Sequence, residues 1–150
     1  MQLTLFSDYS LRLLLYLAVR RDQVVTLAEV SSAYGISKNH LVKVVQGLLA
    51  EGLIESVRGR GGGLRLAREP HDINVATVLQ RTEPHTHLVE CFDAQTNTCP
   101  IDGACGLKIA LLKARKAFFG ELEQYTLADF VPRKQALIEI WNLQLEKRLA

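Results

Sequence analysis

The chain contains only three cysteines, and Cys91, Cys99 and Cys105 lie within the single stretch CFDAQTNTCPIDGAC. Seven residues separate the first two and five separate the last two, so the stretch lacks the CxxC spacing that wraps two sulfurs around one zinc ion. Wider spacing suits an iron–sulfur cluster, which is held by cysteines spread over a loop. Pro100 and Gly103 would let that loop bend. Two other interpretations stay open, namely a zinc ion and metal-free thiols that act as a redox switch.

A 4Fe–4S cluster needs four protein ligands, so three cysteines leave one iron short. An oxygen or nitrogen ligand would hold that iron less firmly than a thiolate and leave the site more open to small molecules. Cys105 also begins a predicted helix, whose positive N-terminal end favours thiolate over thiol. The candidates for the fourth ligand near the loop are His85, His87, Glu90, Asp93, Asp102, or a residue from a second chain.

The composition indicates a protein that folds in water and has about the size of one domain. The chain has 150 residues, of which 48% are hydrophobic, yet it has no apolar run long enough to cross a membrane and no signal-peptide pattern at its start. We therefore expect a cytoplasmic protein without membrane contact. In that reducing compartment, clustered cysteines serve metal binding or redox chemistry more often than a structural disulfide.

Positive charge is concentrated in the N-terminal half. Residues 1–68 carry nine Lys or Arg against five Asp or Glu, whereas residues 69–150 carry nine against eleven. This asymmetry favours a polyanionic partner for the first half of the chain and a different role for the second.

The first half has the helix signals of a helix-turn-helix. We predict a helix over 7–21 capped by Ser7, then a helix over 26–35 with a capping box and Gly35 as its stop. A third helix over 37–52 has one apolar stripe, formed by Leu41, Val44, Val45, Leu48 and Leu49. A hairpin around the loop RGRGGG follows in 53–68, and together these elements predict a mainly α fold with a winged helix-turn-helix.

The second half is predicted to hold three further helices. Asn74 caps a short one, and 106–125 forms a long one whose apolar face (Leu107, Leu111, Ala114, Phe118, Leu122) needs a partner helix. The last helix covers 133–149. We thus divide the chain into a DNA-binding domain (1–82), a cysteine loop for cluster binding (83–106), and the dimerisation and C-terminal helices (107–150).

The polar face of the helix over 37–52 carries side chains that can contact DNA bases or phosphates, and the wing adds cations and glycines that permit close backbone approach. The predicted DNA-binding residues are Ser37, Lys38, Asn39, His40, Lys43, Arg58, Arg60, Gly61, Gly62 and Gly63. The alternative is a solvated helix face and a merely flexible loop. No second cofactor motif, acid/base pair or nucleophile constellation occurs, so we do not expect an enzyme.

Five segments together resemble the iron–sulfur winged-helix family of regulators, which includes IscR, and within it the repressors that respond to nitric oxide. They are MQLTLFSDYSLRLLLYLA, YGISKNHLVKVVQGL, VRGRGGGLRLA, LVECFDAQTNTCPIDGACGLK and YTLADF. The resemblance implies a homodimer with a long dimerisation helix, and a repressor of double-stranded operator DNA that is released when its cluster is nitrosylated. The alternative that it leaves open is a regulator of the IscR type, which senses iron–sulfur supply or redox state.

The same resemblance assigns ligands. Cys91, Cys99 and Cys105 stand at the three cluster positions, and Asp8 stands where an aspartate from the other subunit completes a 4Fe–4S cluster. The plain interpretation of Asp8 is a favourable charge at a helix N-terminus. Family members also hold 2Fe–2S clusters and use histidine, which keeps His85 and His87 as second choices. The seven-residue spacer after Cys91 is longer than is common in close relatives.

Overall fold

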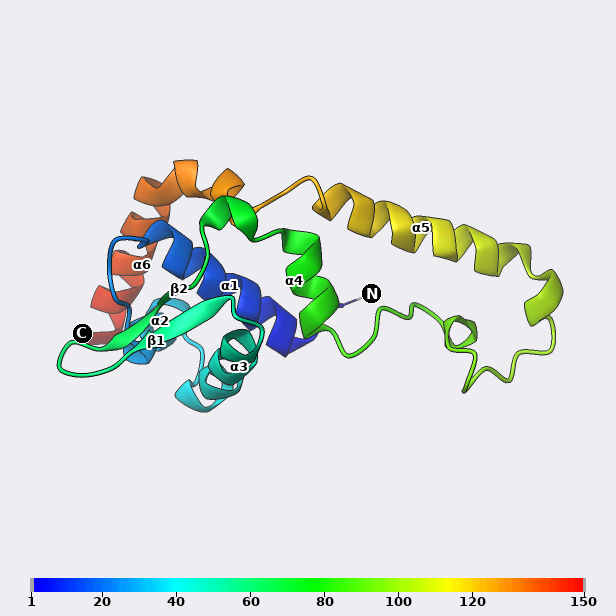
Figure 1. Cartoon of the computed structure of the whole chain (residues 1–150), viewed down its shortest axis with the longest axis horizontal. Coiled ribbons are helices and arrows are strands. Elements are labelled where there is room, and N and C mark those ends of the chain that lie inside the picture. Colours follow the sequence, from blue (N-terminus) through cyan, green and yellow to red (C-terminus); the bar gives the residue numbers. More distant parts are fainter. Residues whose placement is uncertain (1, 150) are drawn as a thin grey trace.

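The computed structural model describes residues 2–149, and residues 1 and 150, which the predicted domains include, lie outside the described part. The chain is mainly helical with one two-stranded antiparallel sheet, as the sequence predicted. Its principal elements are α1 (Leu5–Val19), α2 (Leu27–Tyr34), α3 (Lys38–Ala50), β1 (Ile54–Val57), β2 (Gly63–Leu66), α4 (Val75–Thr82), α5 (Gly106–Leu122) and α6 (Lys134–Leu149) (Figure 1). Short 3₁₀ turns are η1 (Pro70–Asp72), η2 (Glu90–Phe92), η3 (Asp102–Ala104) and η4 (Leu127–Arg133).

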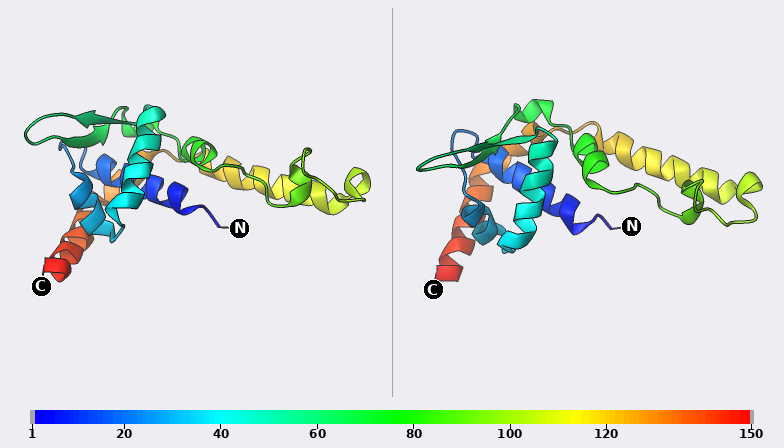
Figure 2. Two further views of the ribbon diagram at one scale, coloured as in Figure 1. Left: turned by 90° about the horizontal axis from the view of Figure 1, so that it is seen from below. Right: turned by 60° about the horizontal axis from the view of Figure 1, so that its bottom comes forward.

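The molecule has a compact head and a projecting arm. We use "arm" for residues 84–122, in which the segment before α5 runs out alongside that helix and α5 returns to the head (Figure 1). The wing hairpin projects from the head on the side opposite the arm (Figure 2). Within residues 2–149, we find no helix long and apolar enough to span a membrane.

Helix α1 runs through the centre of the head, where Leu13, Leu14 and Leu17 are almost fully buried. The predicted cap of this helix is wrong, because Thr4 is the N-cap and its hydroxyl accepts the backbone N–H of Ser7 at 3.2 Å. The helix begins earlier than expected since the Glu83 carboxylate accepts the backbone N–H of Thr4 at 2.8 Å and so fixes the cap from another element.

The helix-turn-helix forms as the local signals predict. Thr26 and Glu29 make a reciprocal capping box, in which each backbone N–H donates to the other side chain, at 2.6 and 3.2 Å. Gly35 ends α2 with φ 70°, a conformation that glycine adopts without a steric penalty. Ser37 caps α3, which buries Leu41, Val44 and Leu48 of the predicted stripe against α1 and α2.

The wing is more than a hairpin, since the loop after α1 adds a third stretch of backbone to it. Ile54 pairs with Leu66 across the two strands, and Val25 then bridges to Leu64 through N–H···O bonds of 2.9 and 2.8 Å. The backbones approach so closely that a Cβ on Gly63 would lie 2.5 Å from the Val25 carbonyl oxygen. The sheet is therefore fastened to the core of the head.

Helix α6 packs on the head rather than on α5. Trp141 is only 3% exposed and its ring lies 4.5 Å from that of Tyr16 and 5.6 Å from that of Tyr34. Burial raises the pKa of both tyrosines above the ordinary value. The apolar side of the last helix thus completes the core of the head, and α5 is left in the arm.

Candidate functional site

The first turns of α3 present a continuous polar surface. Lys38, Asn39, His40 and Lys43 are all exposed. The Ser37 hydroxyl accepts the backbone N–H of His40 at 3.3 Å, so its structural role is that of the helix cap. In a helix-turn-helix the N-terminal part of the second helix enters the major groove, and this is the part of α3 that offers amide, imidazole and ammonium groups.

The tip of the wing carries cations and tight turns. Arg58 and Arg60 are exposed, and within the described residues neither takes part in an ion pair, whereas Arg65 pairs with Glu55 across the hairpin. Gly61 has φ 80°, and a Cβ on Gly62 would lie 2.4 Å from the Val57 carbonyl oxygen. Two arginines at the tip are therefore free to meet phosphates.

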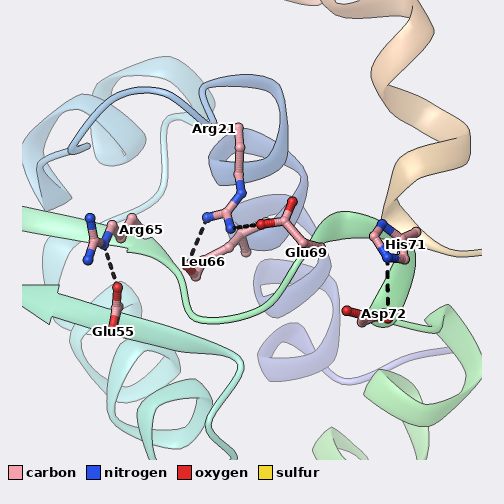
Figure 3. A network of polar contacts seen from close by, with 7 residues as sticks. All are labelled: Arg21, Glu55, Arg65, Leu66, Glu69, His71 and Asp72. Atoms are coloured by element: carbon pink, nitrogen blue, oxygen red, sulfur yellow. Dashed lines mark hydrogen bonds and ion pairs between the residues drawn. The ribbon is translucent and has the colours of Figure 1, made fainter.

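Arg21, just beyond the end of α1, fixes the base of the wing (Figure 3). Its guanidinium donates to the Leu66 carbonyl oxygen at 2.9 Å and to the Glu69 carboxylate at 2.5 Å. This ion pair holds the pKa of Glu69 below its usual value. The His71 imidazole lies 3.5 Å from the Asp72 carboxylate nearby. Arg21 thus links the end of α1 to the exit of the wing.

The three cysteines lie on the arm as free, half-buried thiols. Cys105 is the N-cap of α5, and its sulfur accepts the backbone N–H of Lys108 at 3.4 Å. The Lys108 ammonium pairs with the Asp102 carboxylate, which raises the pKa of Lys108, and negative charge on Cys91 and Cys105 would raise it further. The Lys108 ammonium thus lies near Cys91 and Cys105, and Cys105 stands at the N-terminus of α5.

The segment before α5 is held by side-chain contacts that the sequence did not predict. Arg115 of α5 lies 4.9 Å from the ring centre of Phe92 and donates to the Thr86 carbonyl oxygen at 3.5 Å. The Glu90 carboxylate accepts both the backbone N–H and the hydroxyl of Thr98, each at 2.7 Å, which lowers the pKa of Glu90. These partners are far apart in the sequence and one of each pair lies in an irregular segment. No periodic pattern of residues could therefore have predicted the contacts.

Among the described residues, the other candidates for the fourth ligand do not combine with the cysteines into a metal site. Asp8, in the first turn of α1, pairs with Arg12 at 2.7 Å. The rings of His85 and His87 stack at 5.4 Å beside a pocket that Glu90 and Asp93 also line. In the part of the chain that the structure describes, no three His, Cys, Asp or Glu side chains gather closely enough to hold a metal ion. Three cysteine thiols are the donor type that holds iron–sulfur clusters.

A helix-turn-helix followed by a cationic wing defines a winged-helix DNA-binding regulator. The chain belongs to the Rrf2 family, described as "Iron-dependent Transcriptional regulator", which matches residues 3–133. The family confirms the resemblance that the sequence motifs indicated, and its members are transcriptional regulators rather than enzymes.

Named relatives agree with this assignment. The chain is 43% identical over 145 residues to the HTH-type transcriptional regulator NsrR of Bacillus subtilis (strain 168), covering 96% of this chain and 99% of the relative. It is 50% identical over 132 residues to NsrR of Shouchella clausii (strain KSM-K16), covering 87% and 89%. Among solved structures, IscR from T. potens superposes with a TM-score of 0.70 at 25% identity, covering 88% of this chain and 87% of that one.

Proposed function

We propose that this transcriptional regulator is a repressor that binds operator DNA as a homodimer. It senses nitric oxide through an iron–sulfur cluster on its arm, and the proposed cluster type is 4Fe–4S. The single observation that carries the proposal is the separation of the two surfaces. The polar face of α3 and the wing lie on the head, whereas all three cysteines lie on the arm.

DNA recognition is assigned to α3 and the wing tip. Asn39 can read an adenine edge, and Lys38 and Lys43 can bind guanine or phosphate. Arg58 and Arg60, with the backbone of residues 61–63, would contact the flanking phosphates. In a two-fold dimer, the two α3 helices would enter successive major grooves about 34 Å apart.

The second copy is expected to cover α5. No residue of Gly106–Leu122 is buried in the single chain, and Leu107, on the apolar face of α5, is 67% exposed. A helix of this length extends about 25 Å, so two such helices side by side offer an apolar seam suited to a stable dimer.

Cys91, Cys99 and Cys105 would hold the cluster, and Asp8 of the second copy would supply the fourth ligand. When bound, an iron–sulfur cluster supplies iron atoms that react with nitric oxide. The Asp8 carboxylate accepts Arg12 Nε at 2.9 Å in the single chain, so ligation requires that Asp8 give up this partner. In the single chain, Arg12 is therefore a partner with which an iron atom would compete for Asp8.

Helix α1 is the expected link between the cysteines and DNA. Asp8 lies near its start, and Arg21, just beyond its end, holds Leu66 and Glu69 at the base of the wing. A change in the partner of Asp8 would shift α1 and the surfaces attached to it. A coupling of about 1–3 kcal/mol between the arm and DNA affinity is sufficient for regulation.

The test compares operator binding by anaerobically prepared protein before and after treatment with nitric oxide. We expect affinity to fall after treatment, and we expect Cys99→Ala and Asp8→Ala to lose iron and the response. Asp22→Ala, which removes another exposed carboxylate near α1, should behave like the wild type. Equal affinity in both states would overturn the proposal, and a chromophore that changes first with oxygen or reductant would favour the IscR type of sensor.

A further inference from the structure

We infer that Glu90 is a positioning residue that brings Cys91 and Cys99 together by clamping Thr98. The inference deepens the proposed function, on which it rests, because it explains how two thiols separated by seven residues can serve one centre.

The clamp joins the immediate neighbours of the two cysteines. Glu90 precedes Cys91, and Thr98 precedes Cys99. One carboxylate oxygen of Glu90 accepts both the backbone N–H and the hydroxyl of Thr98. Because each bonded group is one residue away from a thiol, the clamp fixes the start and the end of the spacer at the same place, whatever path the spacer takes between them.

The spacer inside the clamp is ordered by bonds of its own. Asp93 accepts the backbone N–H of Gln95 through its side chain at 2.9 Å and that of Asn97 through its carbonyl oxygen at 3.0 Å. The Asn97 side chain accepts the backbone N–H of Cys99 at 3.0 Å. The additional spacer length is thus folded into a turn, which keeps the entropic cost of closure small.

The far side of the loop has a separate anchor. Asp102 pairs with Lys108 beside Cys105, and its backbone N–H donates to the Cys99 carbonyl oxygen at 3.3 Å. These contacts belong to α5 and η3 and do not involve Glu90. Loss of the clamp should therefore release Cys91 from Cys99 while leaving the Cys99 to Cys105 portion intact, which makes the effect specific to one pair of thiols.

The first test needs no metal. In metal-free full-length protein carrying Cys105→Ser, dibromobimane can cross-link only Cys91 and Cys99, and the product is identified by peptide mass spectrometry. We expect Glu90→Ala to slow cross-linking about tenfold, since two hydrogen bonds that order the pair are lost. Glu90→Gln keeps an oxygen that can accept both bonds and should restore the wild-type rate. Gln95→Ala, an exposed spacer position, is the matched control.

The second test uses anaerobic protein with all three cysteines. We expect Glu90→Ala to release iron to a chelator about tenfold faster and to alter the visible circular dichroism spectrum, whereas Glu90→Gln and Gln95→Ala should match the wild type. Equal cross-linking rates in Glu90→Ala and Gln95→Ala would overturn the clamp while leaving the sensor proposal standing. If wild-type protein binds no iron but its cross-linking depends on Glu90, the clamp is supported and the proposed function fails.

Discussion

The substitution Gly63→Ala tests whether this glycine serves the architecture of the wing. A Cβ there would lie 2.5 Å from the Val25 carbonyl oxygen and 2.9 Å from its carbonyl carbon, and these backbone atoms cannot rotate away. The strain must separate Val25 from the hairpin and break the two hydrogen bonds between Val25 and Leu64, worth about 1 kcal/mol each. Partial exposure of the buried Val25 and Leu64 side chains adds about 1 kcal/mol.

We therefore expect Gly63→Ala to lower the free energy of unfolding by about 3 kcal/mol, a large share of the stability of a domain of this size. Gly61→Ala is the matched control, because Gly61 has φ 80° but a Cβ on it would meet no atom within 4 Å, so it should cost only about 1 kcal/mol. Urea unfolding followed by circular dichroism measures both. A loss for Gly63→Ala no larger than that for Gly61→Ala would refute the steric argument and return Gly63 to a role in DNA contact alone.

Three further results are expected. Glu83→Ala should cost about 1–2 kcal/mol in thermal or urea unfolding, since it removes the acceptor for Thr4 at the start of α1; no loss would show that Thr4 caps the helix unaided. Leu107→Glu should weaken the dimer at least about hundredfold in sedimentation equilibrium, because each copy would bury a charge, while Thr77→Glu at an exposed position on the head should leave it unchanged. Burial raises the pKa of Tyr34 in the folded protein above 10, the ordinary tyrosine value. Above pH 10 the Tyr34 hydroxyl therefore loses its proton in the unfolded chain first, and the free energy of unfolding should fall by about 1.4 kcal/mol per pH unit. Tyr34→Phe should reduce that slope.

Signals confined to a few neighbouring residues predicted the head well. The Thr26 capping box, the Gly35 stop and the Asn74 cap each act within four residues, so the sequence contains the whole interaction. The start of α1 was misplaced because the choice between Ser7 and Thr4 depends on Glu83, which lies far along the chain.

The same distinction, between signals from neighbouring residues and contacts between distant ones, applies to the candidate site. Exposure of Lys38 and Lys43 follows from helical periodicity, and the unburied face of α5 follows from having more apolar surface than one chain can cover. The contacts of Arg21 with Leu66 and of Glu90 with Thr98 could not be predicted, because they join irregular segments whose paths are set by tertiary packing. The assignments of the cluster ligands and of the DNA contacts stay predictions.

The two ends of the arm return to the head at one short helix. The arm leaves after α4, and it re-enters where the Asn74 side chain donates to the Glu123 carbonyl oxygen and the Val75 N–H donates to that of Tyr125, at 2.7 and 3.0 Å. Both ends of the arm therefore meet the head at α4, which is only about 12 Å long. Because both ends of the arm meet the head at the same place, the arm could change in length or sequence without altering how the chain re-enters the head.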